Sequence, residues 1–134
     1  MNETASTLAP MNTLWYKVFM TPDDQLISQM RRGALQYCVL ALLRPRPRYG
    51  LELVKVLSET TSLTASEGTV YPLLSRLRLL GHVRTEWRDS PQGADRRYYA
   101  LTEAGAIALD GFEILWAGFR DGVDGILKES RRAP

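Results

Sequence analysis

The stretch from Ser66 to Arg78 is rich in side chains that can hydrogen-bond to phosphates and base edges. Hydroxyl groups reach phosphate oxygens or base edges, a phenol commonly reaches a phosphate, and a guanidinium can hold guanine through two hydrogen bonds. The apolar residues of this stretch recur at helical spacing and are Val70, Leu73, Leu74 and Leu77. The polar residues predicted on the opposite face are Thr69, Tyr71, Ser75 and Arg76. Any surface helix of an all-α domain would show the same two faces. The neighbouring elements must therefore decide whether this is a DNA-recognition helix or an ordinary surface helix.

Few residues of the chain could support catalysis or hold a metal. His82 is the only histidine and Cys38 the only cysteine. The chain therefore has few residues from which a metal cluster or a catalytic cysteine–histidine pair could form. An enzyme would need a nucleophile with a base, or a metal site, and we therefore expect no catalysis, no cofactor and no metal. Cys38 lies among apolar neighbours and is expected to be a small buried core residue. A redox sensor that acts through this thiol is the alternative.

Positive charge is concentrated in the middle of the sequence. Residues 31–97 contain twelve Arg and Lys against six Asp and Glu, a balance of +6, and each flank sums to −2, which gives the net charge of +2. A basic middle between acidic ends favours a surface that faces a polyanion. A solvated charged face is the alternative. The first interpretation is favoured only if the basic residues belong to one known nucleic-acid-binding motif.

Two helices are predicted before this polar stretch. Thr21 caps a first helix over residues 22–42, because proline suits the first helical position and the apolar residues keep helical spacing. The run RPRPR at 44–48 ends this helix, since a residue before proline is pushed out of helical dihedrals. A second helix spans residues 49–59, and the connector after it holds a short strand around Leu63.

The third helix carries the polar stretch itself. Ser66 caps the approach to it, and Pro72 limits where it begins, because an interior proline removes a hydrogen bond. We therefore expect this helix to start near Gly68 or Thr69 and to end at Gly81.

A β-hairpin is predicted over residues 82–101. Residues 82–88 alternate between two faces, and RRYYAL returns after the turn-rich segment DSPQGAD. Four arginines bracket the tip of the hairpin, and they are Arg84, Arg88, Arg96 and Arg97. They could lie along a DNA backbone or in the minor groove. The alternatives are a solvated hairpin and internal pairing with the acidic residues Glu86, Asp89 and Asp95.

The last predicted helix is long and carries a wide apolar stripe. Thr102 caps it, and the stripe continues to the end of the chain at helical spacing. Gly111, Gly118 and Gly125 recur every seven residues and so lie near one face. Close approach of a partner helix would explain these glycines. A frayed or kinked segment is the alternative, because a glycine weakens a helix by up to about 1 kcal/mol.

Three helices, a hairpin and a long helix follow one another in the order of a winged helix-turn-helix. We expect a mainly α (α+β) fold with a two-stranded wing and a long C-terminal dimerisation helix. The predicted organisation is a partly disordered N-terminal extension over residues 1–21, a winged-helix DNA-binding domain over 22–101 and the dimerisation helix over 102–130. The longest apolar run is too short to span a bilayer and no secretory signal is visible, so we expect a cytoplasmic protein without a membrane partner.

Four segments strongly resemble the PadR family of bacterial and archaeal regulators. They are ISQMRRGALQYCVLALL, YGLELVKVL, SEGTVYPLLSRLRLLGHV and RRYYALTEAG. The most specific part is GTVYPLLSRLRLLG followed by RRYYALT, and the similarity covers roughly residues 26–105. The resemblance implies a winged-helix DNA-binding domain, dimerisation through the C-terminal helix and, usually, repression relieved by a small molecule.

Carried over by position, the resemblance makes GTVYPLLSRL the recognition helix and adds Tyr49, the aromatic that opens the second helix near the DNA backbone. The residues expected to bind DNA are Tyr49, Ser66, Thr69, Tyr71, Ser75, Arg76, Arg96 and Arg97. Asp95 departs from the family wings, which often carry glycine and further basic residues at this place. The first 25 residues extend beyond the family's usual start, and their role is open.

These features favour a sequence-specific transcriptional regulator, a ligand-responsive repressor that binds a palindromic operator in duplex DNA as a homodimer. The alternatives are an activator, regulators resembling the MarR or ArsR groups, and a winged-helix protein-interaction module that does not bind DNA. Trp116 and its copy in the partner could form a slot for a planar aromatic effector, or Trp116 is simply a packed interface anchor. The residues expected at the dimer interface and slot are Phe112, Leu115, Trp116, Phe119 and Val123.

Overall fold

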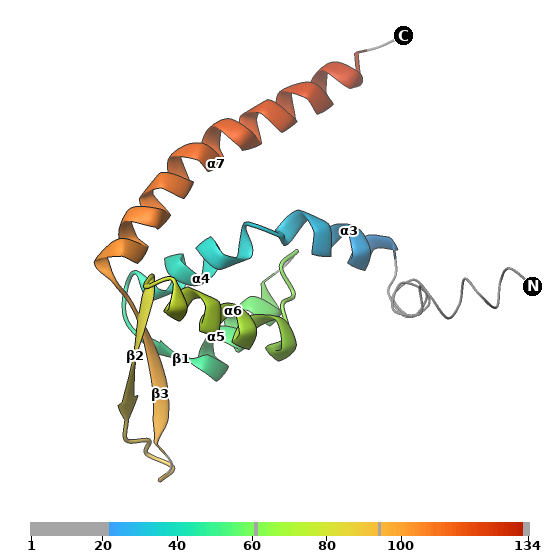
Figure 1. Ribbon diagram of the computed structural model, residues 1–134. Coiled ribbons are helices and arrows are strands. Elements are labelled where there is room, and N and C mark those ends of the chain that lie inside the picture. Colours follow the sequence, from blue (N-terminus) through green and yellow to red (C-terminus); the bar gives the residue numbers. More distant parts are fainter. Residues whose placement is uncertain (1–21, 61, 94, 133–134) are drawn as a thin grey trace, which may run out of the picture. The chain divides into compact units, whose positions relative to one another are not determined.

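The computed structural model describes residues 22–60, 62–93 and 95–132 (Figure 1). The chain divides into two compact units, residues 1–35 and residues 36–134. The extension predicted over residues 1–21 lies outside the described residues.

In the first unit, the helix expected over residues 22–42 ends early. Helix α3 spans Pro22–Arg31, and in the turn that follows the amide of Ala34 donates to the carbonyl of Arg31 over 3.0 Å. Gly33 has a φ of +87°, in the left-handed region that glycine adopts without steric penalty. The prediction of one continuous helix is therefore wrong, because the apolar spacing continues across a break that the backbone of Gly33 makes. Helix α4 begins after this turn and spans Leu35–Leu43.

The core of the second unit lies among α4, α5 (Gly50–Glu59), α6 (Glu67–Leu79) and a small sheet. Helices α5 and α6 pack on each other, and α6 also packs on strand β2 (Val83–Arg88). The apolar side chains buried in this unit are Val39, Leu40, Leu43, Leu53, Leu57, Ala65, Val70, Leu73, Leu74, Leu77, Val83, Tyr99, Ala100 and Leu109. Burying a large side chain contributes about 1.5–3 kcal/mol, so this cluster holds α6 on the sheet. The predicted apolar face of the third helix is confirmed.

The sheet has three antiparallel strands in the order β1 (Arg48–Tyr49), β3 (Arg96–Leu101) and β2. Strands β2 and β3 form the predicted hairpin, which we call the wing, with Val83 opposite Leu101 and Arg88 opposite Arg96. The pairing of β1 with β3 was not predicted. Two residues between prolines and a helix are too few to show a strand pattern, and only the neighbouring β3 makes them extended.

The short strand expected around Leu63 is absent, and a turn occupies its place. The amide of Leu63 donates to the carbonyl of Thr60 over 3.1 Å. Ser62 and Thr64 have φ values of 73° and 41°, which no strand residue adopts. The alternation of Thr and Ser with Leu63 in the sequence therefore belongs to a tight connector between α5 and α6.

Helix α7 spans Glu103–Ser130 and begins as predicted, because the Thr102 hydroxyl accepts a hydrogen bond from the Gly105 amide over 3.0 Å. Gly105 must lack a side chain, since a Cβ there would lie 2.1 Å from the carbonyl oxygen of His82. At the other α7 glycines a Cβ would meet nothing within 4 Å among the described residues. The helix continues past all of them to Ser130.

The second unit is a winged helix-turn-helix: α5 and α6 are the helix pair and the β2–β3 hairpin is the wing (Figure 1). The predicted mainly α fold with a long C-terminal helix is confirmed. Cys38 is only partly buried, so it is not the buried core residue that the sequence predicted, although its partial burial raises the pKa of the thiol. The functional division at residues 22–101 and 102–130 stays a prediction.

Within the described ranges no helix is long and apolar enough to cross a membrane. The same part of the chain holds no group of three or more His, Cys, Asp or Glu residues that could bind a metal ion.

Candidate nucleic-acid interface

Helix α6 presents its polar side chains on the half of its surface that the core leaves free. Ser66 is the N-cap, with extended backbone and an exposed side chain that makes no capping hydrogen bond. Ser75 and Arg76 are exposed, and Thr69 is partly buried. At about 100° per residue, Thr69 and Arg76 lie on one flank, Tyr71 lies about 140° from Arg76 on the other, and Ser75 lies between. The predicted polar residues are therefore spread across the exposed side of α6, where Pro72 and Leu79 are exposed as well.

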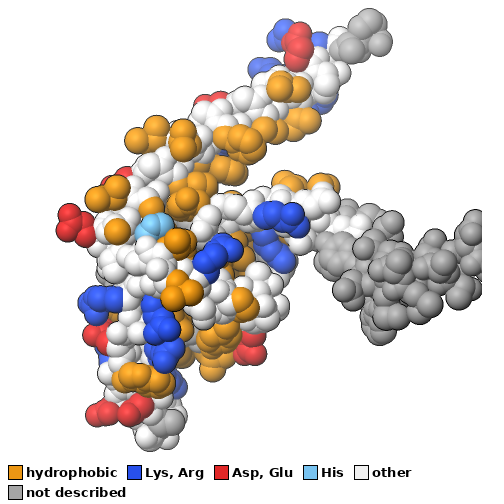
Figure 2. All heavy atoms as spheres, in the orientation of Figure 1, with side chains coloured by type: hydrophobic (Ala, Val, Ile, Leu, Met, Phe, Trp, Pro, Cys, Tyr) orange, Lys and Arg blue, Asp and Glu red, His pale blue; other side chains and the backbone are white. Residues whose placement is uncertain are grey.

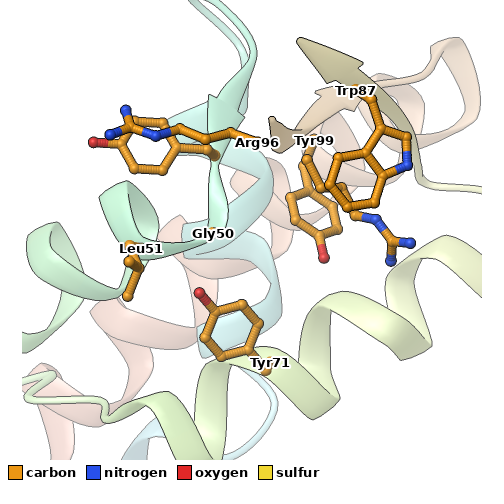
Figure 3. Close-up of a pocket in the computed structure, with 8 residues that line it drawn as sticks. Gly50, Leu51, Tyr71, Trp87, Arg96 and Tyr99 are labelled. Carbon is orange, nitrogen blue, oxygen red and sulfur yellow. The ribbon is translucent and has the colours of Figure 1, made fainter. Parts of the chain in front are cut away.

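Tyr71 approaches the first turn of α5. A Cβ at Gly50 would lie 2.6 Å from Cε1 of Tyr71, so the ring occupies the space that any larger residue at position 50 would need (Figure 3). Burial, and to a smaller extent the charge of Glu67, raises the pKa of the Tyr71 phenol. The phenol therefore stays protonated and able to donate a hydrogen bond. Tyr71 remains 37% exposed, which leaves it within reach of a partner in solution.

A groove of about 360 Å³ lies where the start of α5, helix α6 and the wing meet (Figure 3). Its lining residues are Tyr49, Gly50, Leu51, Tyr71, Trp87, Arg96, Arg97 and Tyr99. Four of these were predicted to bind DNA, namely Tyr49, Tyr71, Arg96 and Arg97. The fold brings these four together from three separate elements. The other four predicted residues, Ser66, Thr69, Ser75 and Arg76, lie at or within α6 outside the lining.

The two adjacent arginines of the wing are held differently. Strand pairing places Arg97 opposite Trp87, and its guanidinium lies 5.1 Å from the centre of the indole. Adjacent strand residues point to opposite faces, so Arg96 leaves the other side of β3, where its guanidinium lies 4.3 Å from the centre of the Tyr49 ring. Arg96 also donates to Oε1 of Gln92 over 2.9 Å. The guanidinium of Arg97 makes no hydrogen bond or ion pair with another described residue, so all its N–H donors are available.

The remaining wing arginines are paired with Glu86. Nη2 of Arg88 lies 2.6 Å from one oxygen of this carboxylate, and Nη1 of Arg84 lies 3.5 Å from the other. The hydrogen bond from Arg88 is the main cause that lowers the pKa of Glu86. Asp89 and Asp95, the other acidic residues near the tip, form no ion pair in the described part of the chain. The internal pairing proposed from the sequence thus applies to Arg84 and Arg88 only.

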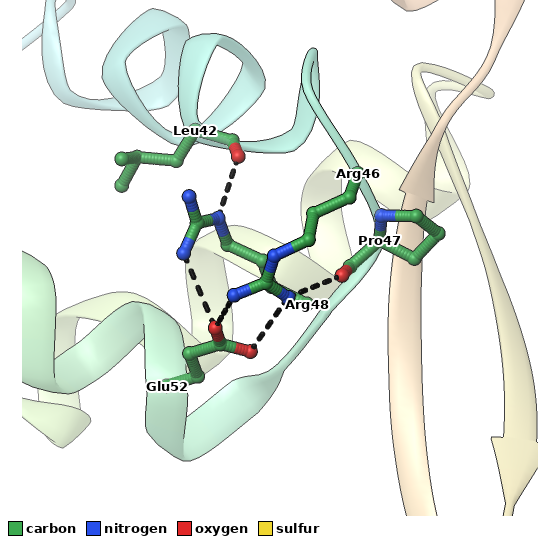
Figure 4. A network of polar contacts seen from close by, with 5 residues as sticks. All are labelled: Leu42, Arg46, Pro47, Arg48 and Glu52. Atoms are coloured by element: carbon green, nitrogen blue, oxygen red, sulfur yellow. Dashed lines mark hydrogen bonds and ion pairs between the residues drawn. The ribbon is translucent and has the colours of Figure 1, made fainter.

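A polar network fixes the chain at the entrance to α5 (Figure 4). Nε of Arg48 donates to the carbonyl of Leu42 at the end of α4 over 2.7 Å, and Nη1 of Arg48 lies 3.2 Å from Oε2 of Glu52. Arg46 also hydrogen-bonds to Glu52 and donates to the carbonyl of Pro47. Burial acts to raise the pKa of Glu52, but the bond from Arg46 and the nearby charges lower it overall. The network joins α4, β1 and α5, and so sets the position of Tyr49.

Sequence reasoning did not select four of the groove residues: Gly50, Leu51, Trp87 and Tyr99. A signal for Trp87 was present, because the alternation of the hairpin puts it on the same side as Val83 and Thr85. The register then places Trp87 and Thr85 opposite Arg97 and Tyr99. No comparable signal marks Gly50, whose place is decided by the approach of Tyr71 from another helix.

The residues predicted for the dimer interface form a second exposed surface, along α7. Phe112 is partly buried, because its ring stacks on Tyr37 of α4 with centroids 4.3 Å apart. Trp116 follows at 5.9 Å from Phe112, and Phe119 at 6.0 Å from Trp116. Leu115, Trp116, Phe119 and Val123 are all exposed, and Figure 2 shows hydrophobic side chains gathered along α7. The row of aromatic rings thus begins at the partly buried Tyr37 and Phe112 and continues onto the exposed surface.

Arg44 holds the start of this surface in place. Its Nη2 lies 2.8 Å from Oδ1 of Asp110 and its Nη1 lies 2.7 Å from Oε1 of Glu113. Arg44 follows α4 directly, so the pairs tie the end of α4 to the first half of α7. Both carboxylates are exposed, which keeps each pair within about 0–1 kcal/mol.

The sequence as a whole matches a known family over this same region. The description "Transcriptional regulator PadR-like family" matches residues 39–111, more than half of the chain and the part that contains α5, α6 and the wing. The chain belongs to the PadR-like family of transcriptional regulators. The predicted resemblance is confirmed, and the PadR-like match includes every residue that lines the groove.

Solved PadR-like structures share this fold. A PadR-like transcription factor from Bacteroides fragilis is 40% identical, with a TM-score of 0.62 over 77% of this chain and 99% of that one. A PadR family regulator from Eggerthella lenta is 35% identical, with a TM-score of 0.67 over 77% and 89%. A PadR-like regulator from Bacillus cereus is 31% identical, with a TM-score of 0.68 over 74% and 96%. The regulator therefore spans nearly the full length of these relatives.

Proposed function

We propose that this PadR-like regulator binds duplex DNA sequence-specifically through α6 and the wing, acts in the cytoplasm as a homodimeric repressor and catalyses no reaction. The observation that carries the proposal is the gathering of Tyr49, Tyr71, Arg96 and Arg97 beside the exposed half of α6. Phenols and guanidinium groups so placed are suited to the phosphates on either side of a helix in the major groove. That groove is about 12 Å wide and accepts one helix.

Reading of base edges is assigned to the outer residues of α6. Ser75 and Arg76 are exposed, and neither makes a side-chain hydrogen bond or ion pair within the described residues. Arginine without an internal partner can place two donors on guanine, while the hydroxyls of Ser66 and Thr69 suit phosphates or base edges. The residues of the groove thus contact phosphates and position the protein on DNA, whereas other residues, on α6, contact the base edges.

The test begins with selection of bound sequences from a random duplex pool by the full chain. Fluorescence anisotropy then compares the selected duplex with a scrambled one at several salt concentrations. We expect a two-fold symmetric consensus and an affinity that falls steeply with salt. If the chain retains no duplex even at low salt, it is instead a winged-helix module that binds another protein.

We assign self-association to the exposed apolar surface of α7. Phe119 is 65% exposed, and the residues around it on the same stripe are apolar as well. A patch of this kind is unfavourable in water and is covered when a second copy packs on it. A two-fold pair places its two recognition helices about one DNA turn apart, which gives a palindromic operator. Sedimentation equilibrium of the full chain measures this state directly.

Ligand response is assigned to the same surface. Two copies of Trp116 that meet across the two-fold axis would bound a slot for a planar aromatic effector, and the same geometry would serve as a packed interface anchor. To regulate, the effector must bind one spacing of the two DNA-binding units better than the other. Tryptophan fluorescence titrated with planar aromatic compounds separates the two roles, because only an open slot gives saturable quenching.

A further inference from the structure

The groove between α5, α6 and the wing offers aromatic faces in addition to the hydroxyl and guanidinium groups assigned to duplex phosphates. Four of its lining side chains are aromatic, two are arginines and none is acidic. Its volume of about 360 Å³ falls in the range of small-molecule sites, about 300–1,000 Å³. A duplex offers phosphates, sugars and base edges to a protein, while the faces of its bases stay stacked inside. An exposed aromatic side chain can stack on a base only when that base is not already stacked inside a duplex.

Trp87 is the most accessible of these faces. It is 63% exposed, although indole is among the least favourable side chains to leave in water. Its ring stands on the wing opposite Arg97, Tyr99 lies beside it, and Tyr71 lines the same groove from α6 (Figure 3). Aromatic platforms beside a positively charged groove are the usual means by which proteins hold unpaired bases.

The arginines supply the charge that such a ligand requires. The guanidinium of Arg97 lies over Trp87 and makes no hydrogen bond or ion pair with another described residue, and the side chain is exposed. Arg96 lies over Tyr49 at the other end of the groove, with one nitrogen bonded to Gln92. Each guanidinium is thus held next to an aromatic face, within reach of an anionic group on a ring stacked there.

We propose that this groove binds one unstacked nucleotide, with its base against Trp87 and Tyr71 and its phosphate against Arg97. The nucleotide is either a free mononucleotide or an unpaired nucleotide of a strand. The proposal rests on the proposed function in one respect. The groove borders the DNA-binding face of α6, so a nucleotide there competes with duplex DNA.

The experiment measures three ligands on the full chain. Fluorescein-labelled pentathymidylate reports strand binding by anisotropy, and equilibrium dialysis reports binding of adenosine 5′-monophosphate. Inorganic phosphate and the duplex chosen by selection serve as competitors. We expect the mononucleotide to displace the labelled strand at a concentration at least about tenfold below that of inorganic phosphate, because phosphate alone cannot stack. Tighter binding of pentathymidylate than of the mononucleotide assigns the site to a strand, and the reverse assigns it to a free nucleotide.

Variants of the wing locate the site. Trp87→Ala and Arg97→Gln should each weaken both probes about tenfold, while Trp87→Phe should restore most of the affinity by keeping an aromatic face. Arg84→Gln is the matched control, because Arg84 is also a wing arginine but is paired with Glu86 and does not line the groove. Circular dichroism checks the fold of each variant. If Trp87→Ala unfolds the wing, Trp87→Phe and Arg97→Gln still test the proposal.

The outcomes separate this inference from the proposed function. Equal displacement by phosphate and mononucleotide, an undiminished affinity of Trp87→Ala, or no binding of either probe would overturn the nucleotide site. If the duplex still binds in that case, the proposed function stands alone. Nucleotide binding without any duplex binding would overturn the proposed function and leave the groove assignment intact.

Discussion

The wing and the outer half of α7 are both exposed, yet their side chains are organised in different ways. Every arginine of the wing is held by a described neighbour: Arg84 and Arg88 by Glu86, Arg96 by Tyr49, and Arg97 by Trp87. On α7 beyond Trp116 an exposed apolar stripe, with Phe119, Val123, Ile126 and Leu127, runs beside exposed charged residues such as Arg120 and Asp121. A single chain can position charged groups in water through its own contacts. It cannot make an exposed apolar stripe favourable, and that requires a second surface.

The largest expected effect tests the α7 side of this comparison. Phe119→Asp combined with Val123→Asp should weaken self-association more than 100-fold, because two apolar side chains that the proposed interface covers would become charges, at about 3 kcal/mol or more in total. Ala117→Asp is the control, because it introduces one such charge on the polar flank of α7, about 160° from Phe119. Sedimentation equilibrium measures both. If the wild-type protein sediments as a monomer, the proposed α7 interface does not exist.

The next effect contrasts two glycines of the same helix. Gly105→Ala should destabilise the fold by about 2–4 kcal/mol, because its Cβ would lie 2.1 Å from the His82 carbonyl oxygen and the start of α7 would have to move. At Gly118 a Cβ would lie in open space within the protomer. Gly118→Ala should therefore leave the free energy of unfolding of the isolated chain unchanged or raise it by up to about 1 kcal/mol. Urea denaturation provides both values. A weaker dimer for Gly118→Ala would show that a partner helix approaches closely at this glycine.

On the DNA-binding side, Arg76→Ala should weaken binding to the selected duplex by about 1–3 kcal/mol and relax the preference at one base pair. Tyr71→Phe should weaken selected and scrambled duplexes alike, because a phenol on a phosphate carries no base information. Anisotropy with the two duplexes gives the ratio. If Arg76→Ala preserves this ratio, Arg76 contacts phosphate and another residue reads the base.

A smaller effect separates the two arginines at the groove. Arg96→Ala with Arg97→Ala should lower the affinity for all duplexes and flatten the dependence of log affinity on log salt, by about 1 for each phosphate that is no longer neutralised. Arg97→Ala alone should account for more of the change, because Arg96 already uses a donor on Gln92. Arg84→Gln serves as the control. An unchanged salt slope in the double variant contradicts the assignment of the wing.

The smallest expected effect concerns the network at Glu52. The pKa of Glu52 is lowered in the folded state, so its stabilisation is complete above the pKa of the unfolded chain and is lost as the pH falls through the folded value. Glu52→Gln should lower the free energy of unfolding at neutral pH by about 1 kcal/mol and remove this part of the acid dependence. Urea denaturation between neutral and acidic pH measures it. A parallel decline in wild type and variant would contradict the role of the network.

The sequence by itself determined the helix pair, the hairpin and the long final helix. Periodicity fixed the buried face of α6, alternation fixed β2 and β3, and the Thr102 cap fixed the start of α7. Each of these signals is local, because it depends on side chains a few residues apart. The same local pattern failed at Gly33, where one backbone conformation divides an otherwise regular helix.

Only the tertiary structure decided those features that depend on contacts between distant segments of the chain. The two residues of β1 become a strand because β3 lies beside them, and Gly50 matters because Tyr71 arrives from another helix. The sequence places Arg96 and Arg97 side by side, but the pleat sends them to opposite faces and to different aromatic partners. A groove built from α5, α6 and the wing depends on distances between segments that are remote in the chain. Such distances are set by packing of the whole core, and no short stretch of sequence contains them.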